Sequence, residues 1–340
     1  MEVHITLSEE EKADVVRLVD GLAGRYHSAE DPEFLCSAPV FAHDLPLRVR
    51  QTVNEFRLRE PAGAICRIAG YPIDDRGIGP TPSHWKERQE HCLPLKEEIL
   101  LVLLGSLLGD VIAWSTQQDG AVVHDIAPIK GHQHEQLGSG SAEELAWHTE
   151  DAFHPYRGDY LGMMCLRNPD RVPTTLAALD VSELDRETLA RLFEPHYTIR
   201  PDKSHLRQNR VAPVAGEVNV ETSYDHIEEM DAKPGKIAVL FGSPEAPYCR
   251  LDPYFMDPPE MPEARQALNR LFELVSSRLR DVVLEAGEFC FIDNFRAVHG
   301  RRSFAARFDG TDRWLKRINI TRNLRLSRGA RRSPESRLLL

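Results

Sequence analysis

Hydrophobic residues recur at helical spacing in the first part of the chain. Ser8, followed three residues later by Glu11, is a capping-box pattern, and apolar residues then repeat every three or four positions up to Gly24. The same spacing predicts an amphipathic helix over residues 47–58, and a continuous apolar run predicts a buried helix over residues 95–109. We therefore expect a group of N-terminal helices over residues 8–58 and one further helix after them.

The pattern changes to short β-type segments after residue 109. These segments alternate with turns rich in Gly, Pro and Asp up to about residue 255, and strands return after a helix expected over residues 262–280. Phe289 and Phe291 then share one face of an alternating segment. Short strands separated by turn residues favour a mainly β core, a sandwich or a barrel, with flanking helices.

Two polar segments differ from this core. Residues 202–235 are rich in Lys, His, Asn and Asp, which predicts a lid or binding loop, with plain surface disorder as the alternative. Residues 326–340 are basic and contain proline, and we expect them to form a disordered tail. The remainder, residues 1–325, is expected to be a single domain whose β core spans about 110–325.

Composition narrows the class of protein. The 340 residues are 41% hydrophobic, which is enough for a sizeable core, and the net charge of −11 argues against nucleic acid as a partner. That charge is compatible with a small cationic substrate. No apolar run reaches the length of about 18 residues that a membrane helix needs, and the acidic N-terminus lacks a signal-peptide core, so we expect a cytoplasmic protein. The oligomeric state is left open.

The six cysteines are scattered along the chain and include no CxxC pair. This spacing is typical of buried thiols and does not suggest a disulfide framework or a structural zinc site.

A candidate metal site lies in the segment AWHTEDAFHP. His148 and Glu150 are one residue apart, so on a strand they point to the same face. His299, far downstream, is a candidate third ligand. His-x-Glu with a distant His is the facial-triad pattern, which holds iron(II) on one side and leaves other positions open for oxygen chemistry.

Other metal patterns fit less well. A zinc deaminase also carries His-x-Glu but needs a downstream Pro-Cys-x-x-Cys, and a zinc protease needs HExxH; the chain has neither. His132 and His134 imitate a His-x-His ligand pair, but a solvated turn explains them and they leave no role for His148 and His299. A lone His-x-Glu pair also occurs by chance in many proteins.

Two arginines further along support the metal site. In TDRWLKRINIT, Arg313, Leu315, Arg317 and Asn319 share one strand face. Arginines aimed at a core are costly unless each finds an anion, and a guanidinium matches a carboxylate in two-point contact. A site that binds two carboxylate-bearing molecules would need both arginines, one for each carboxylate. The alternative is a solvated strand face.

Taken together, these motifs resemble a known family. The segments WHTEDAFHPYRGDYLGMMCLRNPD and DNFRAVHGRRSF and the arginine-bearing strand are similar to the clavaminate synthase-like iron(II)/2-oxoglutarate oxygenases, in particular to free L-arginine β-hydroxylases of peptide-antibiotic biosynthesis. The similarity runs from about Leu45 to Leu324. It implies a double-stranded β-helix (jelly-roll) core, with iron(II), 2-oxoglutarate and dioxygen as cofactor and co-substrates, and with His148, Glu150 and His299 as iron ligands.

The resemblance also implies how the co-substrate is held. Arg313 matches the arginine that pairs with the distal carboxylate of 2-oxoglutarate. Thr175 matches a threonine that helps to hold the same molecule, and the neighbouring Thr174 is an equally close candidate.

The substrate contacts implied by the resemblance come from several segments. Arg317 matches the residue that binds the α-carboxylate of the amino acid. Gln117 matches a glutamine at the α-amino group, with Gln118 as the alternative, and Glu150 would share that contact. Asp252 matches an aspartate that binds the guanidinium.

The sequence departs from the family pattern beside Asp252, because Tyr254 stands where a second aspartate is expected. Ser139 and Ser141 both lie where the family has a serine near the substrate. Asp225 in the expected lid could supply a further carboxylate.

The activity implied is hydroxylation of the β carbon of free L-arginine or a close guanidino amino acid, with a second hydroxylation at the γ carbon left open. A desaturase or oxidative cyclase on the same scaffold is the alternative within the enzyme class. A zinc hydrolase and a non-catalytic jelly-roll module that keeps its metal site are the alternatives outside it.

Overall fold

A large mixed sheet forms the centre of the computed structural model, which describes residues 2–87, 94–207 and 220–340. Its strand order is β1–β2–β13–β6–β15–β3–β16, and β4 also pairs with β15. The long central strands β6 and β15 are almost wholly buried. The strands are β1 (Val3–Thr6), β2 (Ile65–Ala69), β3 (Asp110–Trp114), β4 (His124–Ile126), β6 (Tyr160–Arg167), β13 (Phe289–Asp293), β15 (Trp314–Thr321) and β16 (Leu338–Leu339).

A second, four-stranded sheet lies against the large one. Its order is β12–β7–β14–β5, with all pairs antiparallel. Two strand pairs lie outside both sheets, β9 with β10 and β8 with β11. The bounds are β5 (Leu145–His148), β7 (Thr174–Ala178), β8 (Thr198–Ile199), β9 (Leu240–Ser243), β10 (Ala246–Cys249), β11 (Met256–Asp257), β12 (Arg280–Val282) and β14 (Ala297–Arg301).

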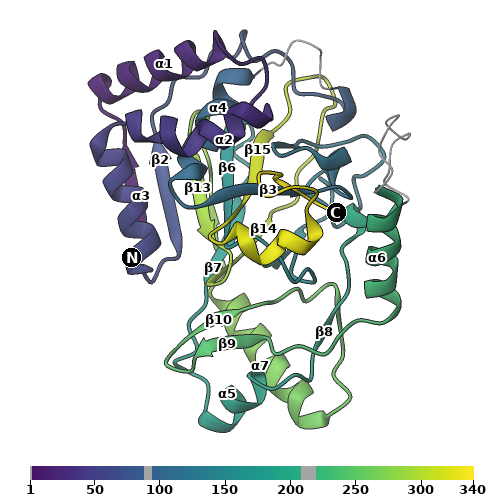
Figure 1. Cartoon of the computed structure of the whole chain (residues 1–340). Coiled ribbons are helices and arrows are strands. Elements are labelled where there is room, and N and C mark those ends of the chain that lie inside the picture. Colours follow the sequence, from purple (N-terminus) through teal and green to yellow (C-terminus); the bar gives the residue numbers. More distant parts are fainter. Residues whose placement is uncertain (1, 88–93, 208–219) are drawn as a thin grey trace.

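Helices cover the outer faces of both sheets (Figure 1). The N-terminal helices α1 (Glu9–Ala23), α2 (Pro32–Phe41), α3 (Leu47–Arg59) and α4 (Leu95–Ser106) pack on the large sheet. Helix α4 is almost wholly buried, because α1 and α2 contact it as well as β15. On the smaller sheet lie α5 (Arg186–Leu192) and α7 (Pro262–Ser277), while α6 (Val220–Ala232) lies to one side. The capping box predicted at Ser8 is present.

The strand β15 alternates as its sequence predicts. Trp314, Ile318 and Ile320 face the cluster beneath the N-terminal helices, whereas Leu315 belongs to a separate cluster formed between the two sheets. Phe289 and Phe291 likewise share the helix-covered face of β13. The inner faces of the two sheets therefore enclose the space into which the arginines of β15 point.

The expectation of a disordered tail is wrong. Residues Leu324–Ala330 form a helical turn, β16 pairs in parallel with β3, and Leu339 is buried against Ile112 and Trp114. Arg331 explains the order, because its guanidinium donates hydrogen bonds to the backbone carbonyl groups of four residues of the same tail. Its charge thus organises the segment instead of keeping it in solvent.

The polar stretch 202–235 is described only in part, since residues 208–219 lie outside the described residues. Its first part forms a short helical turn, Lys203–His205, and its last part contains α6. The strand β1 and the helix α2 had no counterpart in the sequence analysis.

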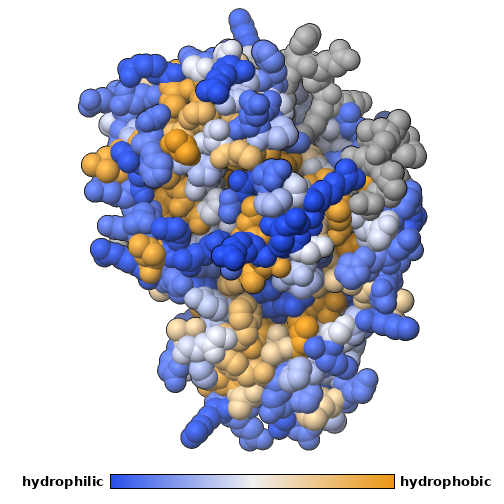
Figure 2. Space-filling view, viewed as in Figure 1, coloured by the Kyte–Doolittle hydropathy of each residue, from blue (hydrophilic) through white to orange (hydrophobic). Residues whose placement is uncertain are grey.

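In the view of Figure 2 the margin of the molecule is hydrophilic, and apolar side chains gather in patches towards the middle and lower part of this face. None of the helices in the described part of the chain combines the length and the hydrophobicity needed to cross a bilayer.

Candidate active site

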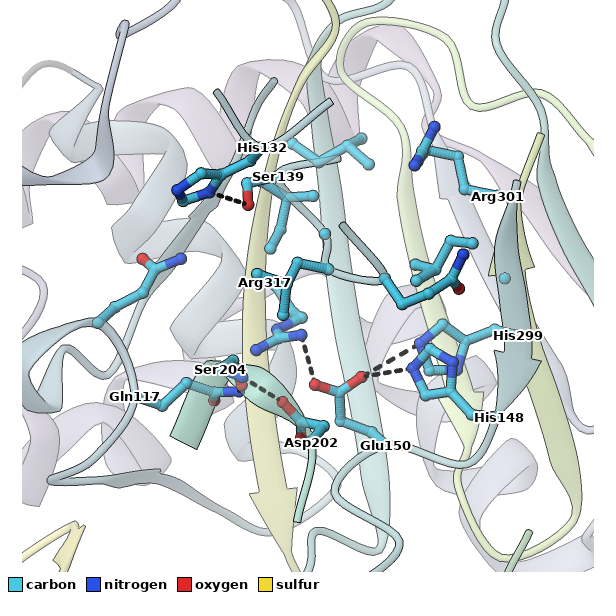
Figure 3. A pocket seen from close by; sticks show the side chains of 18 of the residues that line it. Gln117, His132, Ser139, His148, Glu150, Asp202, Ser204, His299, Arg301 and Arg317 are labelled. Atoms are coloured by element: carbon cyan, nitrogen blue, oxygen red, sulfur yellow. Dashed lines mark hydrogen bonds and ion pairs between the residues drawn. The ribbon is translucent and has the colours of Figure 1, made fainter. Parts of the chain in front are cut away.

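Three ligand-type side chains converge where the smaller sheet faces the larger one. His148 at the end of β5 and His299 in β14 are directly paired in strand register, and Glu150 follows two residues after His148. The Oε2 atom of Glu150 lies 3.2 Å from Nε2 of His299 and 3.6 Å from Nε2 of His148 (Figure 3). The strand pairing therefore produces the cluster that the His-x-Glu spacing predicts.

The donor atoms suit a divalent metal such as iron(II). Glu150 Oε2 is buried and makes no hydrogen bond, and the three ligand atoms lie within 4.8 Å of one another. His148 donates from Nδ1 to the carbonyl of Ala146 at 2.8 Å, which turns Nε2 towards the site. Burial lowers the pKa of His299 to about 4, whereas burial at His148 is outweighed by the carboxylates of Glu150 and Asp252, which raise the pKa of that ring to about 9.

The second oxygen of Glu150 faces a cation. Arg317 Nη1 forms an ion pair with Glu150 Oε1, and Arg317 Nη2 lies 2.8 Å from Nδ1 of His124. Burial alone would raise the pKa of Glu150, but Arg317 and the two histidines hold it well below its usual range. Glu150 is therefore ionised, and its two oxygens face different partners: Oε2 faces the two histidines and Oε1 faces Arg317.

Arg313 is buried without a carboxylate partner in the part of the chain that the structure describes. Only 6% of the residue is exposed, its one hydrogen bond runs from Nη2 to Oγ1 of Thr174 at 3.2 Å, and its Nε has no partner. Burial lowers its pKa to about 10, which still leaves it charged at neutral pH. A buried cation of this kind needs an anionic ligand.

The threonine beside Arg313 corrects one residue of the sequence analysis. Thr174 lines the cavity, whereas Thr175 does not and lies on the opposite face of β7, beside Gly300. Of the two candidates, the structure therefore places Thr174 in the site.

One cavity of about 250 Å³ connects the metal cluster to both arginines. Most candidate residues meet in its wall, since it is lined by Gln117, Ser139, His148, Glu150, Asp252, Tyr254, His299, Arg313 and Arg317.

Gln117 and Gln118, the two candidates for the contact with the substrate amino group, differ in whether their side-chain amide has an atom left to bind a ligand. Gln118 exchanges two hydrogen bonds with the backbone of Asp125, at 2.9 and 3.0 Å, which engages both ends of its amide. Gln117 donates from Nε2 to Ser204 Oγ at 2.8 Å, and its buried Oε1 has no partner. Gln117 is thus the glutamine with an acceptor to offer a ligand.

The serines separate in a similar way. Ser139 lines the cavity and its Oγ lies 3.0 Å from Nδ1 of His132. Ser141 is buried outside the lining, and its carbonyl accepts a hydrogen bond from Arg301.

Asp252 supplies a further carboxylate to the cavity wall, close enough to His148 for each to shift the pKa of the other. It is only 7% exposed, and its Oδ1 accepts the backbone N–H groups of Tyr254 and Phe255 at 3.2 Å each. Burial raises its pKa to about 6. Tyr254 lines the same cavity but is 53% exposed, so it lies at the rim.

Asp225 does not join the site. It lies on α6, largely exposed, and forms an ion pair with Arg207 at 2.7 Å outside the cavity. Asp202, from the beginning of the same polar stretch, lines the cavity instead. Sequence reasoning missed it because the segment has no periodicity from which to rank its acidic residues.

Matches to known proteins define the class. Residues 103–319 match the model of the taurine catabolism dioxygenase TauD/TfdA family. This protein therefore belongs to that family of oxygenases. It is 46% identical to an L-ornithine/L-arginine 3-hydroxylase of Catenulispora acidiphila over 98% of this chain and 99% of that protein. It is 42% identical to an enduracididine β-hydroxylase of Streptomyces hygroscopicus over 98% of both.

A solved structure is equally similar. The crystal structure of the non-heme iron oxygenase OrfP with iron, succinate and (3S)-hydroxy-L-arginine superposes with a TM-score of 0.94 at 46% identity, covering 99% of both chains. A second OrfP structure contains iron and α-ketoglutaric acid, with a TM-score of 0.88. These matches confirm the family resemblance inferred from the sequence.

Replacing His299 by Ala should strongly weaken iron(II) binding, because it removes a ligand. Loss of a residue that only hydrogen-bonds a ligand costs roughly 10–100-fold in metal affinity, and the loss of a ligand should cost more. Iron content after anaerobic reconstitution and gel filtration measures this, and circular dichroism checks the fold. His196→Ala, at a half-buried histidine paired with Glu194 outside the cavity, is the matched control. Stoichiometric iron in the His299 variant would contradict the ligand set.

Proposed function

We propose that this enzyme hydroxylates the β carbon of free L-arginine, or of a close guanidino amino acid, with iron(II), 2-oxoglutarate and dioxygen. One observation carries the proposal: a single cavity places two buried arginines and a metal triad near two carboxylates, Asp252 and Asp202. Such a cavity offers guanidinium groups to carboxylates and carboxylates to a cation. The arginine and enduracididine hydroxylases among the relatives support the same conclusion.

The two sheets fit this chemistry. We infer that the eight-stranded and four-stranded sheets are the walls of a double-stranded β-helix, because their inner faces share one apolar cluster and the metal triad lies between them.

The co-substrate occupies the Arg313 side of the cavity. The distal carboxylate of 2-oxoglutarate pairs with the Arg313 guanidinium and accepts from the Thr174 hydroxyl, which satisfies the buried charge. Iron(II) held by His148, Glu150 and His299 supplies, with 2-oxoglutarate and dioxygen, the oxidising power that replaces C–H by C–OH.

The amino-acid end of the substrate lies at Arg317. The α-carboxylate binds the Arg317 guanidinium, which otherwise pairs with Glu150. The α-ammonium group donates to the unpartnered Oε1 of Gln117 and to Glu150 Oε1. Both charges of the amino-acid group are thereby matched.

The guanidinium end lies at the carboxylates. Asp252 is held by two backbone N–H groups, and Asp202 is held by the N–H of Ser204 at 2.7 Å. Asp202 supplies the second negative charge that the family pattern would have placed at Tyr254. Fixing both ends of the molecule presents the middle of its side chain to the metal, where orientation controls the rate.

Ornithine is a second candidate substrate, because the Catenulispora relative is named for both amino acids and two carboxylates also suit an ammonium group. Its shorter side chain would reach the carboxylates less well.

The test is an aerobic incubation of the purified protein with iron(II), 2-oxoglutarate and a panel of free amino acids, followed by mass spectrometry. We expect arginine to gain one oxygen with matching formation of succinate, and fragmentation should place the hydroxyl on the β carbon. A gain of two oxygens would add a second hydroxylation, for which OrfP has a dihydroxy-L-arginine complex. Loss of two hydrogens would favour the desaturase or cyclase, and no product from any guanidino amino acid would refute the proposed substrate.

Asp252 predicts a pH dependence of arginine binding. Its pKa of about 6 means that the carboxyl is neutral below that pH and ionised above it. Arginine affinity should therefore be constant above about pH 7, fall by up to about tenfold per pH unit below about pH 6, and level off near the affinity of Asp252→Asn. Asp252→Asn should lack this dependence and bind about 1.5–3 kcal/mol more weakly at neutral pH.

Anaerobic calorimetric titrations across this pH range measure the effect. The ratio of variant to wild-type Kd isolates Asp252, because the histidine ligands titrate in both proteins. Asp225→Asn, on the outer surface, is the control and should match wild type. An unchanged affinity in Asp252→Asn would show that the guanidinium binds elsewhere.

A further inference from the structure

His205 is a fully buried histidine at the end of the short helical turn Lys203–His205, beside the cavity. Its exposed fraction is 0%, and both ring nitrogens have partners: Nε2 lies 2.9 Å from Asp151 Oδ1 and Nδ1 lies 2.8 Å from Thr116 Oγ1. The rings of Trp114 and Phe153 pack against it edge-on, with centroids 5.9 and 4.9 Å away. Such a group is strongly fixed, because each buried hydrogen bond would be costly to leave unmade.

Its two partners belong to the active-site framework. Asp151 directly follows the metal-ligand residue Glu150, and Thr116 directly precedes Gln117. His205 therefore joins three segments that are distant in the sequence: the chain after β5, the chain after β3, and the polar segment 202–206.

The polar segment carries cavity residues of its own. Asp202 and Ser204 line the cavity beside Gln117 and are joined by a hydrogen bond (Figure 3). The Gln117 amide donates a second hydrogen bond to Ser204 Oγ. His205 Nε2 also lies 3.8 Å from Asp202 Oδ2, so the imidazole faces both acidic side chains. Asp202 Oδ1 accepts the backbone N–H of Ser204 at 2.7 Å, so the Asp202 carboxylate is held on the same helical turn as His205.

Other attachments of this segment are weaker. Lys203 pairs with Glu135 at 2.6 Å, but both side chains are more than a third exposed, and such pairs contribute little. Leu206 is only partly buried against a small apolar cluster. His205 is the one residue of segment 202–206 whose side chain is wholly enclosed.

We propose that His205 is a positioning residue for substrate selection: by binding Asp151 and Thr116 it holds segment 202–206 so that Asp202 and Ser204 face the cationic end of the substrate. It touches neither the substrate nor the metal and acts through Asp202. The inference rests on the proposed function, because it takes a guanidino or amino cation as the group that Asp202 meets. Small displacements matter here, since a shift near 1 Å can cost about a hundredfold in rate.

The test compares His205→Leu with His205→Gln. Leu cannot bond Asp151, whereas the Gln amide keeps an N–H donor. For the Leu variant we expect KM for arginine to rise at least about tenfold and hydroxyarginine formed per succinate to fall below about half, because a misplaced substrate leaves co-substrate oxidation uncoupled. The KM for 2-oxoglutarate and the iron content should not change, and His205→Gln should recover much of the coupling.

Two further measurements separate positioning from general damage. In an Asp202→Asn background, His205→Leu should change KM for arginine by less than about twofold, because residues that act through one another are non-additive. Limited trypsin digestion of the iron-loaded protein should cut faster after Lys203 and Arg207 in His205→Leu. His196→Gln should resemble wild type in every assay.

The outcomes are distinguishable. If wild type hydroxylates arginine and His205→Leu keeps its KM, coupling and trypsin resistance, the positioning role is overturned while the proposed function stands. Additive effects of His205 and Asp202 would also overturn it. If wild type hydroxylates no amino acid, the proposed function fails, and unchanged trypsin cleavage in His205→Leu would then refute the anchoring role independently.

Discussion

The burial of positive charge on β15 is the constraint on which the site depends. Moving an ion out of water costs several kcal/mol unless a partner compensates. On the outer face of the strand, Lys316 is compensated by two carboxylates, at 2.6 and 2.7 Å. On the inner face Arg317 pairs with Glu150, while Arg313 has only a threonine hydroxyl among the described residues. Lys316 is thus compensated within the chain, whereas Arg313 has no carboxylate partner among the described residues, and we propose that the distal carboxylate of 2-oxoglutarate compensates it.

The metal triad and the cations come from opposite walls of the same cavity. His148 and His299 are neighbours by strand register on the smaller sheet, whereas Arg313 and Arg317 belong to the larger one. Glu150 joins the two walls, because one of its oxygens faces the histidines and the other faces Arg317. Under the proposed function, a substrate carboxylate on Arg317 would therefore also alter the surroundings of Glu150.

Much of the site could be predicted because successive side chains of a strand alternate between its two faces. The spacing of His148 and Glu150 and the alternation along β15 depend only on which strand face a residue occupies, and both were inferred from the sequence. A one-residue ambiguity reverses the face, which is why Thr174 and Thr175 could not be separated in advance. In the polar segment no periodicity ranks Asp202 above Asp225, because tertiary contacts of its neighbour His205 decide the placement. The C-terminal tail is ordered because several backbone carbonyl groups accept hydrogen bonds from Arg331. These groups come together only in the folded chain, so the sequence pattern does not reveal them.

The most direct measurement of the central claim is a crystal structure of the anaerobic complex with iron(II), 2-oxoglutarate and L-arginine. The account predicts that the distal carboxylate of 2-oxoglutarate lies on Arg313 and the arginine α-carboxylate on Arg317, with the ligand guanidinium against Asp252 and Asp202. A ligand bound in the reverse sense, or a co-substrate carboxylate placed away from Arg313, would contradict the account.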